Sequence, residues 1–289
     1  MIDAPASKSF SAPRGVPQRN RISPLAWMNL VCLDAPLVAV SWHWLFAREF
    51  AIPVAPGTPP ALFLTAWLIY LADRFVDSLS VDPDGSSSLR QRFCFRHRRA
   101  WLAAIAVIAL GDVFVVLSAL DPIALAVGSA VAAAAFAYLL VNQLRPQLWR
   151  LLPLKEVSIG FIFAAGVMVG LMRNLPASAL LPSLLFAVLC ATNCICIAFW
   201  ERGLDTAQRR ISIATEFGGI ERLIPLLLAA LCANAVWFFG TFRSVTPALA
   251  ASAALLGFVH IARARLQADV RTALADLVLL TPLAVIAFS

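Results

Sequence analysis

The sequence predicts an all-α integral membrane protein in which nine transmembrane helices form a bundle with a central cavity. Of the 289 residues, 61% are hydrophobic and only 13% are charged, and the mean hydropathy is +0.83. Soluble domains have roughly 25% charged residues, so the composition excludes an ordinary soluble protein. The formal net charge of +7 does not indicate a nucleic-acid partner. The basic residues lie between apolar runs, where membrane topology alone accounts for them.

Each transmembrane helix is predicted from an apolar run close to the roughly 20 residues that a helix needs to cross a bilayer. The nine runs are 25–47, 60–77, 101–120, 122–142, 155–172, 179–200, 222–241, 246–262 and 272–288. Pro122 and Pro182 fall near helix starts, where proline is tolerated. Residues 1–24 are rich in proline, serine and basic residues, so we expect a disordered cytoplasmic tail. Residues 25–289 are expected to form one transmembrane domain.

The distribution of lysine and arginine predicts the orientation. With nine spans, 20 of the 23 basic residues fall on one side of the membrane. Cytoplasmic loops have an excess of these residues. We therefore expect the N-terminus and the loops after the second and sixth helices to be cytoplasmic, and the C-terminus to lie outside. The expected location is the inner (cell) membrane of a bacterium.

Two acidic pairs end the second and sixth predicted helices. Asp73 and Asp77 are four residues apart, as are Glu201 and Asp205, and an arginine follows the first acid of each pair. This spacing places both carboxylates of a pair on one helix face. Mg²⁺ takes oxygen ligands and is often shared between carboxylates and substrate phosphates. The four acids are thus candidate ligands that hold Mg²⁺ against a diphosphate. The alternative is a local ion pair between each acid and its neighbouring arginine.

Basic residues near the acidic pairs are candidates for phosphate contacts, because arginine can bind phosphate oxygens bidentately. The segment 90–99 contains five arginines. For most of them, topology and attraction to anionic lipid head groups are the better explanation. Lys155, at the start of the fifth helix, either reaches a phosphate or extends to the membrane interface.

Polar residues inside other apolar runs are candidate cavity residues. Asp34 lies within the first run, where a carboxylate is costly and usually functional, although it could instead serve packing beside the proline that follows. Asp112 and Asp276 also lie in apolar runs and have the same two interpretations. Asn193 stands eight residues before Glu201, about 80° round a helix, and could face the same cavity.

These motifs resemble those of the UbiA superfamily of intramembrane prenyltransferases, which have nine helices and an acidic motif ending helices two and six. The family's first motif runs Asn-Asp-x-x-Asp-x-x-x-Asp, and its second is commonly Asp-x-x-x-Asp. Asp73-Arg74-Phe75-Val76-Asp77 matches the latter half of the first motif. Glu201-Arg202-Gly203-Leu204-Asp205 matches the second, with Glu for Asp. Leu33-Asp34-Ala35-Pro36 and Pro153-Leu154-Lys155-Glu156 are similar to the family's helix-one motif and its entry to helix five.

The first motif differs from the family's at its start. Ile69 and Tyr70 stand where the family has Asn-Asp. One carboxylate and one amide of the expected ligand set are therefore missing. Tyr70 lies one turn before Asp73 and could offer a hydroxyl group to a phosphate, but no metal-binding charge.

The resemblance implies an enzyme that transfers a prenyl group from a polyprenyl diphosphate to an aromatic or lipid acceptor within the bilayer, with Mg²⁺ as cofactor. It implies that the four acids are catalytic metal ligands. It also implies diphosphate contacts from basic residues: Arg74, Lys155, Arg209 and Arg210. A bilayer-facing cavity would shield the allylic cation from water.

The alternative function is that of a non-catalytic membrane protein, either a carrier or a divergent family member that has lost the full metal site. The residues at positions 69 and 70 favour it. The sequence leaves open the acceptor, which could be an aromatic acid, a quinone precursor, a porphyrin or a lipid head group. It also leaves open the prenyl chain length and the oligomeric state.

Overall fold

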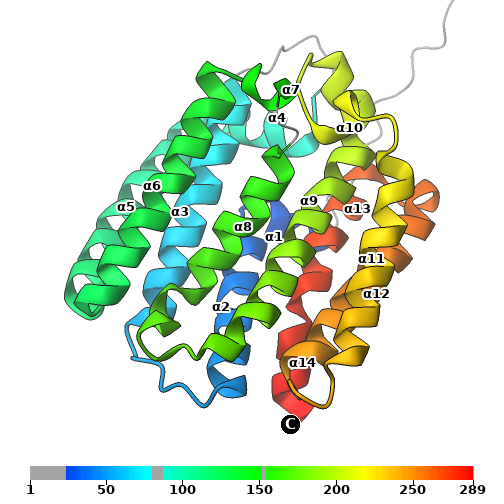
Figure 1. The fold of residues 1–289 in the computed structure, drawn as a ribbon. Coiled ribbons are helices and arrows are strands. Elements are labelled where there is room, and N and C mark those ends of the chain that lie inside the picture. Colours follow the sequence, from blue (N-terminus) through cyan, green and yellow to red (C-terminus); the bar gives the residue numbers. More distant parts are fainter. Residues whose placement is uncertain (1–23, 80–86, 152–153, 289) are drawn as a thin grey trace, which may run out of the picture.

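The computed structural model describes residues 24–79, 87–151 and 154–288, and all regular secondary structure in these ranges is helical (Figure 1). The predicted tail 1–24 lies outside the described residues except for its last position. The α-helices are α1 Pro24–Leu30, α2 Asp34–Glu49, α3 Thr58–Leu79, α4 Leu89–Arg96, α5 Arg98–Ala119, α6 Pro122–Leu144, α7 Leu148–Leu151, α8 Lys155–Met168, α9 Leu180–Ala207, α10 Ile213–Glu216, α11 Ile220–Trp237, α12 Val245–Ala262, α13 Ala268–Leu277 and α14 Thr281–Phe288. Short 3₁₀ turns are η1 Val169–Asn174, η2 Ala177–Ala179, η3 Arg263–Arg265 and η4 Val278–Leu280.

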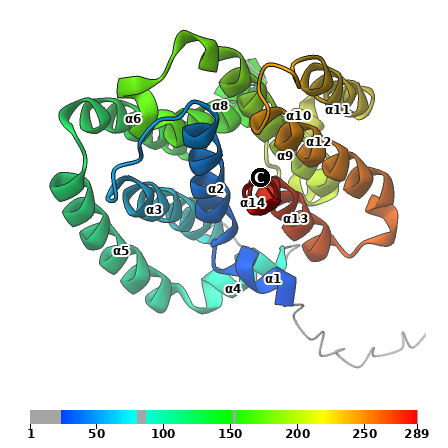
Figure 2. The ribbon, with the colours of Figure 1, turned by 90° about the horizontal axis from the view of Figure 1, so that it is seen from below.

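The long helices stand side by side as a bundle. Helices α5 and α6 form one outer edge and α11 and α12 the opposite one, in views along and across the bundle (Figures 1 and 2). The short helices α4, α7 and α10 are all at one end of the bundle, and the C-terminus lies at the other (Figure 1). This arrangement leaves α2, α3, α8, α9 and α13 to shape the interior.

Seven helices in the described ranges are long and apolar enough to cross a membrane. They are Arg98–Ala119, Pro122–Leu144, Lys155–Asn174, Ala177–Ala207, Ile220–Trp237, Val245–Arg265 and Ala268–Ala287. They correspond to the seven predicted spans from 101–120 onward. The multi-pass membrane architecture is thus confirmed, whereas the count of nine spans stays a prediction. Helix α3 is 22 residues long but carries charged residues near its end.

The prediction of one helix over 25–47 is wrong. Helix α1 ends at Leu30 and α2 begins at Asp34, with Cys32 in the left-handed region at φ 57°. Pro36 has no N–H and its ring crowds the carbonyl four residues earlier, so a continuous helix through residues 31–33 is disfavoured. The break places Asn29 and Asp34 inside the protein, where both are buried.

Helices α8 and α9 pack closely because α8 has a glycine at their contact. A Cβ built on Gly160 would lie 2.4 Å from the backbone nitrogen of Ala191. Small residues permit such close approach between membrane helices. The contact fixes α9, which ends in the second acidic pair, against α8, which starts at Lys155.

Candidate functional site

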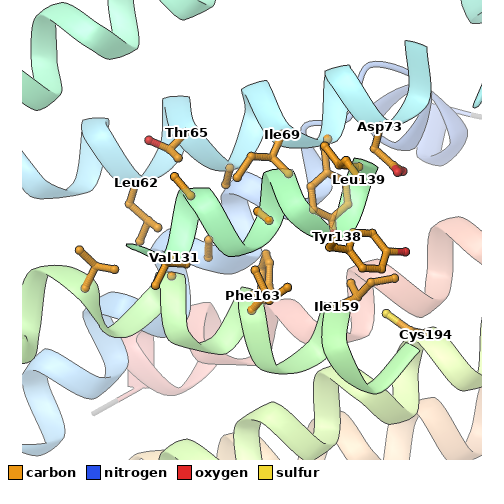
Figure 3. Close-up of a pocket in the computed structure, with 18 of the residues that line it drawn as sticks. Leu62, Thr65, Ile69, Asp73, Val131, Tyr138, Leu139, Ile159, Phe163 and Cys194 are labelled. Carbon is orange, nitrogen blue, oxygen red and sulfur yellow. The ribbon is translucent and has the colours of Figure 1, made fainter. Parts of the chain in front are cut away.

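A cavity of about 440 Å³ runs inside the bundle and is bordered by α2, α3, α5, α6, α8, α9 and α13. Much of its wall is apolar, with Leu62, Ile69 and Phe163 among the lining side chains (Figure 3). Thr65 and Asp73 project from the same helix at separate positions along it (Figure 3). The cavity is therefore a long apolar space with polar groups at particular points, a form typical of binding sites for small amphiphilic molecules.

Both acidic pairs line this cavity at the end where α3 and α9 finish. Asp73 and Asp77 come from α3, and Glu201 and Asp205 come from α9. Their spacing within each helix places the two carboxylates of a pair on one face. Two helices distant in sequence thus bring four acids to one end of one cavity.

Long-range ion pairs hold one acid of each motif. Arg210 Nη1 donates to Asp77 Oδ2 at 3.0 Å, and Arg90 Nη2 donates to Glu201 Oε1 at 2.5 Å. The Thr272 hydroxyl also donates to Glu201 Oε1, at 3.2 Å. The predicted alternative paired each acid with the arginine next to it, whereas these arginines come from other segments. The ion pairs tie the α4 segment and the chain after α9 to the acidic end.

Basic side chains also reach the acidic end of the cavity. Arg74, Lys155 and Arg210 line it. Arg74 Nε and Arg90 Nη1 are buried donors that lack a hydrogen-bond partner among the described residues. Buried donors without partners are costly. An anionic ligand in the cavity would supply the missing acceptor for Arg74, which lines it.

Arg209 and Arg210 are neighbours with opposite placements. Arg209 has φ 54° and an exposed side chain outside the cavity wall. A left-handed residue after a helix reverses the chain direction. This reversal turns Arg210 back toward Asp77, where its Nη2 also donates to the Asp77 carbonyl at 3.2 Å. Both arginines were predicted to contact the diphosphate, but of these two only Arg210 lines the cavity.

Some of the predicted cavity residues line the cavity and one does not. Tyr70 and Asn193 line the cavity, whereas Asp34 is not on its wall. Asp34 accepts a hydrogen bond from Asn29 at 2.6 Å. Asp112 and Asp276, for which the sequence left a functional and a packing role open, both line the cavity, and Asp276 accepts hydrogen bonds from two asparagines. Its one sequence signal is a carboxylate within an apolar run.

The described residues contain no preformed metal site made by protein groups alone. Among the residues that the structure describes, no group of three or more His, Cys, Asp or Glu side chains could hold a metal ion. Mg²⁺ commonly uses only one or two carboxylates and completes its shell with waters and substrate phosphates. The paired carboxylates therefore suit an ion that arrives together with a diphosphate.

The Arg90–Glu201 pair yields a test of this geometry. Arg90 is 8% exposed and Glu201 is 22% exposed, so solvent screens the pair only in part. We expect Arg90→Ala and Glu201→Ala to show a coupling energy of about 1–2 kcal/mol in a double-mutant cycle of detergent-solubilised protein. Strictly additive losses of stability would contradict direct contact between the two side chains. An Arg92→Ala, Glu201→Ala cycle is the matched control and should be additive.

These helices and this cavity define a multi-pass membrane protein with a polar-ended central cavity. Comparison with solved structures then identifies the fold. The chain is similar to the apo structure of a UbiA homolog from Aeropyrum pernix K1, with a TM-score of 0.61 and 15% sequence identity over 89% of this chain and 98% of that one. The protein has a UbiA-like membrane fold, as the motifs predicted. No model of a known protein family matches the sequence, and neither does any curated protein.

Proposed function

We propose that this protein is a divergent UbiA-type prenyltransferase. It would transfer a prenyl group from a polyprenyl diphosphate to an aromatic or lipid acceptor within the membrane. The observation that carries the proposal is the meeting of both acidic pairs with Arg74 and Lys155 at one end of a largely apolar cavity. A charged diphosphate and an apolar chain require these two environments side by side.

Different residues would bind the two ends of the substrate. Arg74 and Lys155 would bind diphosphate oxygens, and the guanidinium donor left without a partner at Arg74 would be satisfied there. The apolar wall, including Ile69 and Phe163, would hold the chain and exclude water from a developing allylic cation. Positioning and electrostatic stabilisation of the leaving group would then promote C–O cleavage.

Mg²⁺ is the cofactor that these residues suit. Asp73 and Asp77 on one side, and Glu201 and Asp205 on the other, would hold it as two pairs together with the diphosphate. When bound, the ion neutralises charge that builds on the departing diphosphate. Asp77 and Glu201, which pair with Arg210 and Arg90 in this structure, would release these arginines to hold the ion.

A second function is favoured by the residues at the start of the first motif. Ile69 and Tyr70 line the cavity but supply no carboxylate. A carrier would bind a prenyl diphosphate here without cleaving it. In both functions the partners are a prenyl diphosphate and the lipid bilayer, with the acidic end on the cytoplasmic side.

Ligand-dependent stability tests the proposal. We expect Mg²⁺ with geranylgeranyl diphosphate to raise the melting temperature of the purified protein by several degrees, because a ligand that binds the native state stabilises it by about 2.7 kcal/mol at 100 times its Kd. Either component alone should give a smaller rise. Geranylgeraniol, which lacks phosphate, is the matched control. Its effect on the melting temperature should be the same with and without Mg²⁺.

Turnover distinguishes the two functions. A prenyltransferase releases pyrophosphate and gives prenylated product when an acceptor panel is added, whereas a carrier shows the thermal shift alone. Absence of both the shift and the release would refute the assignment of this cavity.

A further inference from the structure

A buried polar cluster lies where α1, α2, α9 and α13 meet. The Asn29 amide donates to Asp34 Oδ2 at 2.6 Å and to Asp276 Oδ2 at 2.9 Å. The Asn193 amide donates to Asp276 Oδ1 at 3.0 Å. Each oxygen of the Asp276 carboxylate is thus fixed by a different asparagine. Ionisable and amide groups this deep in a membrane bundle are costly and indicate function.

The cluster opens to the cavity on one side. Asp276 and Asn193 line the cavity together with Tyr70, whereas Asn29 and Asp34 lie behind them. Asn193 is only 4% exposed, and its Oδ1 has no hydrogen-bond partner in the described part of the chain. The Asn193 NH₂ group donates to Asp276, so the Asn193 oxygen points elsewhere.

The wall at this point therefore offers acceptors rather than donors. Asn193 Oδ1 is unused, and Asp276, whose carboxyl group also contacts that of Asp34, lines the cavity beside it. An unpaired acceptor in an apolar interior costs free energy unless a ligand satisfies it. The complementary ligand group is a hydrogen-bond donor such as a hydroxyl, and a carboxylate would be repelled by Asp276.

The position of the cluster suits a second substrate. Asn193 precedes Glu201 on α9 by eight residues, or about 12 Å along the helix axis. Tyr70 precedes Asp73 on α3 by one turn. A molecule held at the cluster would lie deeper in the apolar cavity than a diphosphate at the acidic end. That is the side on which the first carbons of the prenyl chain would lie.

We propose that Asn193 and Asp276 bind the hydroxyl group of an uncharged, electron-rich acceptor, and that Asp276 is a catalytic residue that receives the acceptor's proton. This inference rests on the proposed prenyl transfer. The C–O bond to the diphosphate breaks and its electron pair leaves with the diphosphate. The O–H bond of the acceptor breaks as its proton moves to the Asp276 carboxylate, and the electron pair left on the acceptor forms the new bond to the first prenyl carbon. Asn29 and Asn193 position that carboxylate.

The central test is Asp276→Asn in nanodisc-embedded protein with Mg²⁺ and geranylgeranyl diphosphate. We expect transfer to fall by about 100-fold or more, as for loss of a general base, while the thermal shift caused by Mg²⁺ and diphosphate stays at the wild-type value. Asp269→Asn, on the same helix but away from the cavity wall, is the control and should keep wild-type transfer. Wild-type transfer by Asp276→Asn would overturn the proposal.

A second variant keeps the test decisive if Asp276→Asn does not fold. Asn193→Ala should raise the KM for the acceptor at least about tenfold, because it removes a hydrogen bond worth roughly 1.4 kcal/mol, and leave the KM for the diphosphate unchanged. Neutral phenols should be prenylated faster than their carboxylated analogues. An unchanged acceptor KM, or preference for the carboxylated phenols, would refute the acceptor site but not the proposed prenyl transfer. Absence of diphosphate binding by the wild-type protein would refute the proposed function instead.

Discussion

Replacing Asp73 with asparagine is expected to lower prenyl transfer by about 100-fold or more and to abolish the Mg²⁺-dependent part of the diphosphate thermal shift. Asparagine has nearly the same size and keeps one oxygen but has no charge, so packing around α3 should change little. Asp73 lines the cavity, and no ion pair of its carboxylate is found among the described residues. Asp73 is therefore less committed to holding the fold than Asp77 and Glu201, which form ion pairs.

The measurements are pyrophosphate release and melting temperature, each with and without Mg²⁺. Asp121→Asn is the matched control. Asp121 caps α6 by accepting from the Ile123 and Ala124 N–H groups, and asparagine caps a helix about equally well. This variant should keep wild-type activity and stability. Full turnover by Asp73→Asn would show that Asp73 is not a ligand of the proposed metal site.

The acidic end of the cavity was predictable because its signals are local. Asp73 and Asp77 lie within one helix, as do Glu201 and Asp205, and the period of the α-helix alone puts each pair on one face. The resemblance in motif order then implied that both helices meet at one site. Arg210 was likewise close to the second motif in sequence, whereas Lys155 was marked by its place at the start of the fifth predicted helix.

The partners of these groups were not predictable, because their contacts join distant parts of the chain. Arg90 reaches Glu201 across 111 positions, but in sequence it is one arginine of several in a basic loop. Asn29 reaches Asp276 across 247 positions, and nothing near either residue indicates the other. The break before Asp34 was missed for a different reason, since the apolar run continues through it and only the proline marks it.

Changing Gly160 to alanine is expected to destabilise the protein more than any other glycine-to-alanine change on α8. The added methyl carbon would lie 2.4 Å from the Ala191 nitrogen and 2.7 Å from its Cα. Backbone atoms cannot rotate away, so α8 and α9 must separate, at a cost of at least about 1–3 kcal/mol. Because α9 carries Asn193 and the second acidic pair, we also expect weaker binding of Mg²⁺ and diphosphate.

Gly166→Ala on the same helix is the control for this experiment. Its methyl carbon would have one neighbour, Val131 Cγ1 at 3.9 Å, which is an ordinary contact. Alanine is also the better helix former by about 1 kcal/mol, so this variant should be as stable as the wild type or more so. Melting temperatures in one detergent compare the two directly. Equal melting temperatures would mean that α8 and α9 are not in backbone contact at Gly160. The position of α9, which carries the second acidic pair, beside the start of α8 would then need another cause.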